Sequence, residues 1–171
     1  VAHPKLKPLN LDIAHYDSPD RRGVDVALLY CKDRFRVYDV IPYRLVTNDT
    51  SFRTRDQLLV SGVLDGIDTL HVVVNHWPSK LGGEKRSMPK RIAAANLSKH
   101  ITDSLMQDNP MAKVVIMGDL NDNPNAKSIR QYLGAKSKIK DTQMYQLYNP
   151  MYNLYMDGVW SYVYRDEPNV I

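Results

Sequence analysis

The chain has 171 residues, of which 43% are apolar and 25% charged, an ordinary composition that excludes disordered and fibrous proteins. No stretch approaches the length of uninterrupted apolar sequence that a membrane-spanning helix needs. The net charge of +4 favours an anionic partner. The length predicts one globular domain with a substantial buried core.

The start of the chain shows no recognisable targeting signal. Residues Val1 to Lys5 are polar and lack the features of a secretory signal peptide. A removed signal or an upstream segment stays an alternative, so the location is open, with secretion and the periplasm among the options. The single cysteine, Cys31, excludes a disulfide bond within the chain and leaves the redox compartment open.

The first half of the chain is rich in predicted strands, seen as short alternating or continuous apolar runs between turn residues. Pro42 lies inside one such run and marks an edge strand or a bulge, because proline cannot donate a ladder hydrogen bond. Asp65-Gly66 separates the last two runs and favours a hairpin turn. The predicted strands cover residues 11–15, 24–31, 35–45, 57–64 and 68–76.

The second half alternates strand with helix. Pro89 suits a first helical turn, and apolar residues at three- and four-residue spacing continue to a stop at Asn109-Pro110. Residues 114–117 are apolar at every position, which is typical of a strand covered on both faces. A strand, helix, strand order predicts parallel strands whose carboxyl ends meet at one edge. A further helix is predicted over 125–133 and a further strand over 159–164.

Polar side chains follow the two strands that this helix connects. Asn75 and His76 end the first strand, and Asp119 and Asn121 follow the second. We expect His76, Asp119 and Asn121 to converge at the shared edge, where open α/β sheets bind their ligands. A carboxylate and an amide two residues apart suit a metal ion, a water or a phosphate. The alternative is a turn in which Asp and Asn bond their own backbone.

A basic group follows His76 directly. Its members fall within twelve residues and are opposed only by Glu84, and together they suit a polyphosphate backbone. Each of them alone also suits an ordinary solvated surface. The group comprises Lys80, Lys85, Arg86, Lys90 and Arg91.

Three of these motifs together resemble the central part of the endonuclease/exonuclease/phosphatase superfamily, which contains deoxyribonuclease I. The Asn-His-x-x-Ser-Lys form is most similar to that of its secreted bacterial nucleases. Residues 18–30 resemble the preceding strand of that family, so the match covers about residues 12–130. The motifs are Val74-Asn75-His76-Trp77-Pro78-Ser79-Lys80, Arg91 in the helix, and Met117-Gly118-Asp119-Leu120-Asn121.

The resemblance implies a fold of class α/β, a layered sandwich of two mostly antiparallel or mixed sheets flanked by helices. It also implies a metal-dependent phosphodiester hydrolase, foremost a nuclease, that uses Mg²⁺ or Mn²⁺ and acts on nucleic acid or another phosphodiester. Asp119 and Asn121 would then hold the metal and align the water, and His76 would contact the phosphate. Further substrate contacts are predicted at Asn75, Lys80 and Arg22.

Parts of the superfamily pattern are missing from this chain. An early Asn, a metal-binding Glu and a terminal Ser-Asp-His do not occur in their expected contexts. Residues 1–171 are therefore expected to form a single partial domain, incomplete at both ends and inactive alone. Such a domain would pair with a complementary fragment or self-associate through exposed sheet edges.

Two alternatives to a nuclease stay open. One is a phosphatase or phosphodiesterase that acts on inositol phosphates or phospholipid headgroups, because one fold hosts several substrates. The other is a non-catalytic anion-binding module whose site has decayed.

Overall fold

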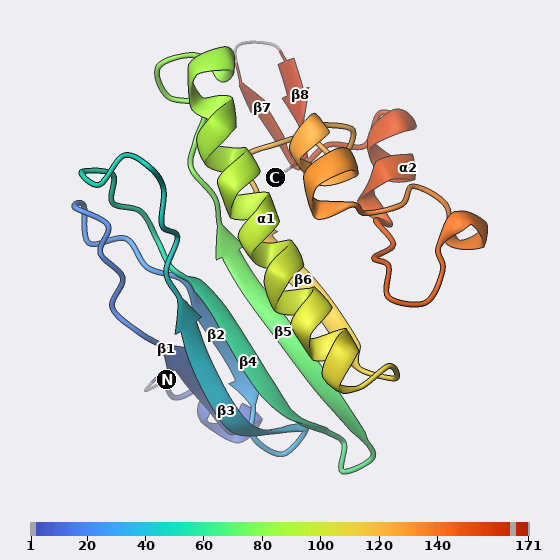
Figure 1. Ribbon diagram of the computed structural model, residues 1–171. Helices are drawn as coiled ribbons and strands as arrows, with labels where there is room; N and C mark the ends of the chain where they lie inside the picture. Colours follow the sequence, from blue (N-terminus) through green and yellow to red (C-terminus); the bar gives the residue numbers. More distant parts are fainter. Residues whose placement is uncertain (1–2, 165–166, 171) are drawn as a thin grey trace. The chain divides into compact units, whose positions relative to one another are not determined.

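The computed structural model describes residues 3–164 and 167–170, which form two compact units. The first unit runs to His76 and includes Met111–Gly118, and the second contains the remaining residues. Strands dominate the first unit and helices the second (Figure 1). This mixture of sheets and helices confirms the predicted α/β class.

The strands of the first unit form two sheets. A two-stranded antiparallel sheet pairs β1 with β2, and a second sheet has the order β3-β4-β5-β6. The predicted bounds of the first, fourth and fifth strands are confirmed, whereas the second and third are shorter than predicted. The strands are β1 (Leu11–His15), β2 (Ala27–Cys31), β3 (Phe35–Tyr43), β4 (Gln57–Leu64), β5 (Asp68–His76) and β6 (Lys113–Asp119), and a short turn η1 (Lys7–Leu9) precedes them.

The predicted hairpin joins β4 to β5. Asp65 and Gly66 both have positive φ, 52° and 71°, as tight hairpin turns require. The N–H of Ile67 donates to the carbonyl of Leu64 at 3.0 Å and closes the turn. Local turn chemistry therefore sets the register of the central strand pair.

Strand β3 lies at the edge of its sheet, as Pro42 predicted. Pro42 stands opposite Leu58 of β4. The irregularity in the pairing lies elsewhere, between Val37 and Asp39, so the proline marks the edge and not the bulge.

The core of the first unit joins residues from both of its sheets. The ring of Phe35 meets that of Tyr30 edge to face, with centroids 5.9 Å apart. A Cβ on Gly62 would lie 2.6 Å from Phe35 Cε2, so only glycine leaves room for this ring. Each fully buried valine of the core contributes roughly 1.5–3 kcal/mol. The core consists of Ala14, Val26, Phe35, Leu58, Val60, Val72 and Val74.

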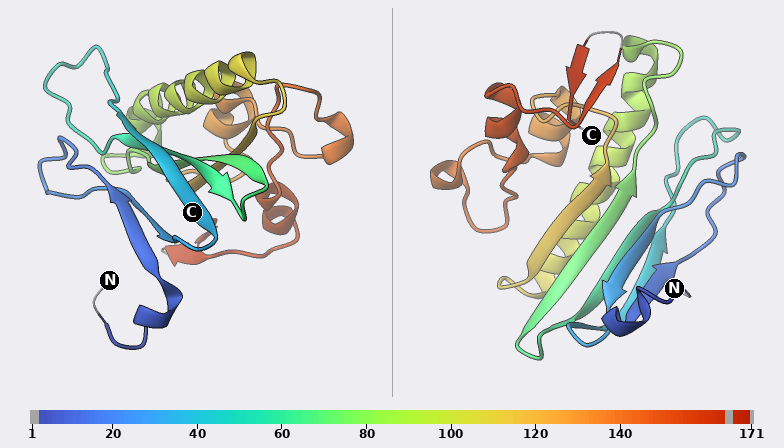
Figure 2. Two further views of the ribbon diagram at one scale, coloured as in Figure 1. Left: turned by 90° about the horizontal axis from the view of Figure 1, so that it is seen from below. Right: turned by 180° about the vertical axis from the view of Figure 1, so that it is seen from behind.

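Strands β5 and β6 run in the same direction, as predicted (Figure 2). At their carboxyl ends the backbones approach so closely that a Cβ on Gly118 would lie 2.0 Å from the carbonyl oxygen of Asn75. Gly118 also has a φ of 114°, which residues with a side chain rarely adopt. This glycine is therefore needed for the close approach of the two strands.

The prediction that β6 is covered on both faces is wrong for this chain. Val115 and Met117 are 44% and 46% exposed, whereas Val114 and Ile116 are half-buried. Successive side chains of a strand point to opposite faces, so the described residues cover one face only. A continuous apolar run in the sequence does not distinguish a strand that is covered on both faces from one that is covered on a single face.

Helix α1 (Glu84–Asp108) begins more than a turn before Pro89, where we predicted its start. The N–H and Oγ of Ser87 both donate to the carbonyl of Gly83, at 3.0 and 2.8 Å, and close the first turn without a contribution from the proline. The predicted end is confirmed, because Asn109 caps the helix through a 3.0 Å bond to Leu105. No helix among the described residues is long and apolar enough to cross a membrane.

The remaining elements of the second unit are short. The helix predicted over 125–133 is a π-helical segment over its last six residues, and Gly134, with a φ of 77°, ends it as predicted. The strand predicted over 159–164 forms only at its end and pairs antiparallel with the last strand. The elements are η2 (Ser128–Leu133), η3 (Ile139–Asp141), α2 (Met151–Met156), β7 (Tyr162–Tyr164) and β8 (Glu167–Asn169).

We predict that Gly118→Ala lowers the free energy of unfolding by roughly 3 kcal/mol or more, because it combines backbone strain with a clash against Asn75. Gly66→Ala is the matched control: its φ is also positive, but no atom lies within 4 Å of the added Cβ. It should cost only about 1–2 kcal/mol. Urea unfolding of both variants measures the difference, and equal losses would contradict the close approach.

Candidate functional site

The segment that follows β6 is fixed by the peptide of Trp77. The Trp77 N–H donates to the carbonyl of Asp119 at 2.9 Å, and the Nδ2 of Asn121 donates to the Trp77 carbonyl at 2.9 Å. Trp77 itself is 1% exposed. Asp119 and Asn121 are therefore held against a rigid part of the second unit.

A local turn sets the mutual geometry of Asp119 and Asn121. The Asn121 N–H donates to Asp119 Oδ1 at 2.8 Å, and Asn121 has a positive φ of 50°, which Asn tolerates. The turn that the sequence left open as an alternative is thus present. The bond from Asn121 N–H also orients the carboxylate of Asp119, so the presence of the turn is compatible with a functional role for Asp119.

The side-chain oxygen atoms of this turn fit a hard divalent ion as ligands. The Nδ2 of Asn121 donates its hydrogen bond to the Trp77 carbonyl. The Oδ1 of the same amide is therefore the atom that can accept a hydrogen bond or bind a metal ion. Asp119 adds a half-buried carboxylate. Mg²⁺ prefers such oxygen ligands and commonly takes only one or two carboxylates, with waters and substrate phosphates completing its shell.

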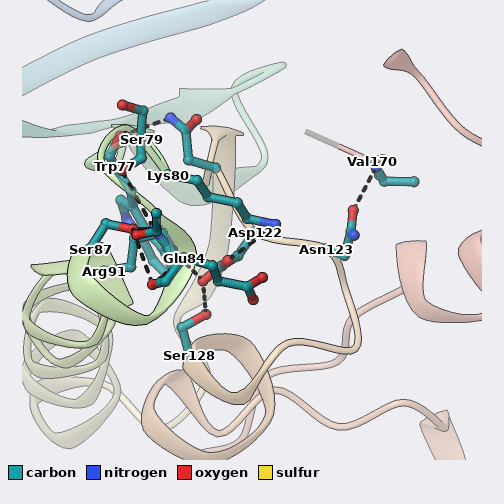
Figure 3. Close-up of polar contacts among 12 residues, drawn as sticks. Trp77, Ser79, Lys80, Glu84, Ser87, Arg91, Asp122, Asn123, Ser128 and Val170 are labelled. Atoms are coloured by element: carbon teal, nitrogen blue, oxygen red, sulfur yellow. Dashed lines mark hydrogen bonds and ion pairs between the residues drawn. The ribbon is translucent and has the colours of Figure 1, made fainter. Parts of the chain in front are cut away.

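A buried ion pair lies directly after this turn (Figure 3). The Nε of Arg91 lies 2.8 Å from Asp122 Oδ2, and both side chains are fully buried. This is a charge contact and not an aligned hydrogen bond. The Oγ of Ser128 donates to the same oxygen at 2.5 Å, and the Nζ of Lys80 lies 3.8 Å from Oδ1. Helix α1, η2 and the loop after β5 thus meet at Asp122.

Arg91 also contacts the start of its own helix. Its NH1 donates to Ser87 Oγ at 2.8 Å and lies 3.5 Å from the carbonyl of Ser79, and its NH2 lies 3.5 Å from the carbonyl of Glu84. The prediction that Arg91 belongs to a phosphate-binding group is wrong, because its side chain has no exposed surface. The buried carboxylate of Asp122 requires a buried cation, and Arg91 supplies it.

Two further contacts fix the rest of the loop. The Oδ1 of Asn123 accepts the N–H of Val170 at 3.0 Å, and the Nδ2 of Asn149 donates to the carbonyl of Pro124 at 3.3 Å. Backbone and side chains therefore hold the segment from Asp119 to Pro124 along its length.

The predicted site residues fall in both units. Asn75 is buried, and its Nδ2 donates to the carbonyl of Val73 at 2.9 Å, while His76 is the half-buried last residue of β5. These two lie in the first unit, whereas Asp119 and Asn121 lie in the second. The convergence of His76 with Asp119 and Asn121 stays a prediction, as do the substrate contacts.

Arg22 is engaged by a carboxylate that the sequence did not single out. Asp20 accepts the Nε and NH2 of Arg22 at 3.1 and 3.2 Å, and also the NH1 of buried Arg55 at 3.0 Å. The side-chain hydrogen bonds from Arg22 hold the pKa of Asp20 well below its usual range, against the opposing effect of burial. The guanidinium of Arg22 remains largely exposed.

One group of possible metal ligands lies elsewhere in the first unit. Ligand atoms of His15, Asp17 and Asp25 lie within 4.8 Å of one another. Asp25 is already satisfied, because the N–H and Oγ of Ser18 both donate to its Oδ1 at 2.7 Å and His15 Nε2 lies 3.3 Å from its Oδ2. These contacts explain the group as an ion pair beside a turn.

We predict that Arg91→Met costs about 3–5 kcal/mol of stability, because it leaves the Asp122 carboxylate buried and unpaired. The double variant Arg91→Met with Asp122→Leu should recover most of this loss. Lys99→Met is the matched control, since Lys99 pairs with Asp103 on the exposed surface of the same helix and should cost about 0.5 kcal/mol.

Thermal and urea unfolding of the wild type and the three variants provide the measurement. An Arg91→Met variant as stable as Lys99→Met would contradict the importance of the buried pair. A double variant that is less stable than Arg91→Met would contradict it as well.

Comparison with known proteins identifies both a family and a fold. A family model described as the endonuclease/exonuclease/phosphatase family matches residues 1–171. ANGEL2, a 2′,3′-cyclic phosphatase, is 14% identical with a TM-score of 0.61, over 82% of this chain and 45% of its own. TDP2 from C. elegans is 23% identical with a TM-score of 0.53, over 68% and 32%. The human Nocturnin catalytic domain with bound sulfate is 18% identical with a TM-score of 0.54, over 75% and 49%.

At these identities the solved structures show the fold alone, and they confirm the predicted fold class. The chain spans less than half the length of each of these three structures. Comparison with curated protein sequences gives no match. The partial domain, the complementary fragment and self-association stay predictions.

Proposed function

Because the chain belongs to the endonuclease/exonuclease/phosphatase family, we propose that it serves the metal-dependent hydrolysis of phosphodiesters, with nucleic acid as the favoured substrate. The main support is the fixed turn in which Asn121 N–H and Asp119 Oδ1 are 2.8 Å apart and the Trp77 peptide holds both residues. This turn presents hard oxygen ligands on a rigid support, as a metal-assisted hydrolase needs.

Each site residue has a proposed role. Asp119 and Asn121 would hold Mg²⁺ or Mn²⁺, and Asp119 would align the attacking water. The bound ion would neutralise charge on the phosphoryl oxygens and lower the pKa of the water. His76 would donate a hydrogen bond to the phosphate, and Asn75, Lys80 and Arg22 are the proposed further contacts to the substrate.

The exposure of the basic side chains supports a polyanionic substrate. Lys85 and Arg86, on the first turn of α1, are exposed. Lys80 is partly exposed, and Asp122 lies 3.8 Å from its ammonium group, so the charge is kept beside the Asp119–Asn121 turn. Several cations around the start of α1 suit a nucleic acid backbone better than a single phosphate.

A phosphatase is the second candidate, because the similar structure of ANGEL2 is described as that of a 2′,3′-cyclic phosphatase. Inositol phosphates and phospholipid headgroups belong to this alternative. A non-catalytic anion-binding module is the third. Assays on plasmid DNA, an inositol polyphosphate and sphingomyelin, each with Mg²⁺ and with Mn²⁺, discriminate among the three.

We predict that Asp119→Asn in the full-length protein lowers hydrolysis of plasmid DNA by about a hundredfold or more, because the amide keeps the shape of the carboxylate and loses its charge. Circular dichroism should show an unchanged fold. Asp141→Asn, the same change at an exposed position in η3, is the control and should retain full activity. Activity of Asp119→Asn within a few-fold of the wild type would refute its proposed role.

We further predict that changing Lys80, Lys85 and Arg86 to Gln weakens binding of duplex DNA and flattens its dependence on salt. Each lost phosphate contact should lower the slope of log affinity against log salt by about 0.9. The matched control neutralises Arg130, Lys138 and Lys140, which are exposed cations of the same unit.

Binding isotherms at several salt concentrations give both slopes. An unchanged slope for the first variant, or an equal change in the control, would mean that Lys80, Lys85 and Arg86 do not contact DNA. A phosphatase with a small substrate would then be the better assignment.

A further inference from the structure

A shallow depression of about 330 Å³ lies on the second unit, near the lower end of the range for small-ligand sites. Its wall combines aromatic and aliphatic side chains with one amide, and none of the lining residues is charged. It therefore suits an uncharged flat group better than a phosphate. The lining residues are Asn125, Tyr155, Met156, Gly158, Val159 and Trp160.

Trp160 contributes the largest aromatic side chain to the wall of this depression. It is 52% exposed, whereas Trp77, the other tryptophan of the chain, is 1% exposed. An indole that keeps half its surface in water offers a face on which a planar ring can stack. Met156 and Val159, both exposed, extend the apolar wall.

The backbone on both sides of Trp160 is fixed. Helix α2 ends in two hydrogen bonds, from the Gly158 N–H to the Tyr155 carbonyl at 3.1 Å and from the Val159 N–H to the Leu154 carbonyl at 2.9 Å. This pattern, with a φ of 81° at Gly158, is a Schellman cap. On the other side the Ser161 N–H donates to Asn169 at 3.0 Å. Little backbone freedom would be lost when a ligand stacks here.

Asn125 links the depression to the Asp119–Asn121 turn. It lies four residues after Asn121, so the two Cα atoms are at most about 14 Å apart, roughly the length of four stacked nucleotides. Its exposed amide can both donate to and accept from the polar edge of a base. A phosphate at the turn and a ring in the depression are thus within reach of one short strand.

We propose that this depression binds a nucleobase of the substrate, stacked on Trp160 with its polar edge towards Asn125. This base-binding site rests on the proposed function in one respect, which is that the phosphate of the substrate lies at the Asp119–Asn121 turn. It narrows the substrate class to nucleic acids, because inositol phosphates have no aromatic face to stack.

Trp160 emission provides a direct test, since a base stacked on an indole quenches its fluorescence and Trp77 is shielded by burial. The purified protein is titrated with a short thymidine oligonucleotide, with an abasic oligonucleotide of equal length, and with inositol hexakisphosphate. Only the first should quench strongly. Trp160→Phe should bind the thymidine oligonucleotide with similar affinity and lose the quenching signal.

Trp160→Leu should weaken binding about 5- to 150-fold, the range observed when a base loses its aromatic partner. Tyr38→Leu removes an equally exposed aromatic side chain from β3 of the first unit and should leave the affinity unchanged. Equal quenching by the abasic oligonucleotide, or wild-type affinity in Trp160→Leu, would overturn the proposal. If Trp160→Leu does not fold, the comparison of the two oligonucleotides on the wild-type protein decides.

The stacking site and the proposed hydrolysis can fail separately. Quenching by the thymidine oligonucleotide without metal-dependent hydrolysis of DNA by the full-length protein would support the base-binding site and contradict the proposed function. Hydrolysis of DNA without base-dependent quenching would support the proposed function and overturn the base-binding site.

Discussion

The buried carboxylate of Asp122 is the constraint on which the candidate site depends. A charge without access to water requires a cation and further hydrogen-bond donors, and Arg91 and Ser128 provide them from α1 and η2. Satisfying one carboxylate therefore fixes the start of a long helix, a short helical turn and the loop after β6 relative to one another. Asp119 and Asn121 immediately precede this fixed point, so their placement follows from it.

Structural and functional explanations of the Asp119–Asn121 turn are compatible. The bond from the Asn121 N–H to Asp119 Oδ1 is the backbone interaction expected of any such turn. Here the same bond orients the carboxylate, and the peptide of Trp77 orients the amide. A turn that would stabilise an ordinary loop thus also prearranges two ligands at the end of a strand pair, where rigid support matters most for chemistry.

Much of the fold was predictable from sequence because its signals are local. The hairpin through Asp65-Gly66 was found with correct bounds, since turn chemistry and strand alternation agree there. The partners of buried charges were not predictable. Arg91 and Asp122 are far apart in the chain, and a basic residue among other basic residues gives no sign that it is buried. The open face of β6 was missed for another reason, since continuous apolar runs occur in strands with either environment.

The close approach of Gly118 to Asn75 also bears on the order in which the protein assembles. Strands β4 and β5 are joined by a tight turn and can pair early, because closing a short loop costs little entropy. Strand β6 reaches β5 only after the whole of α1 has been bridged, and such non-local parallel pairing is intrinsically slow. The residues that follow β6 therefore gain their positions late in folding. In a nascent or partly unfolded chain, the proposed metal ligands would therefore become competent only after β6 has paired with β5.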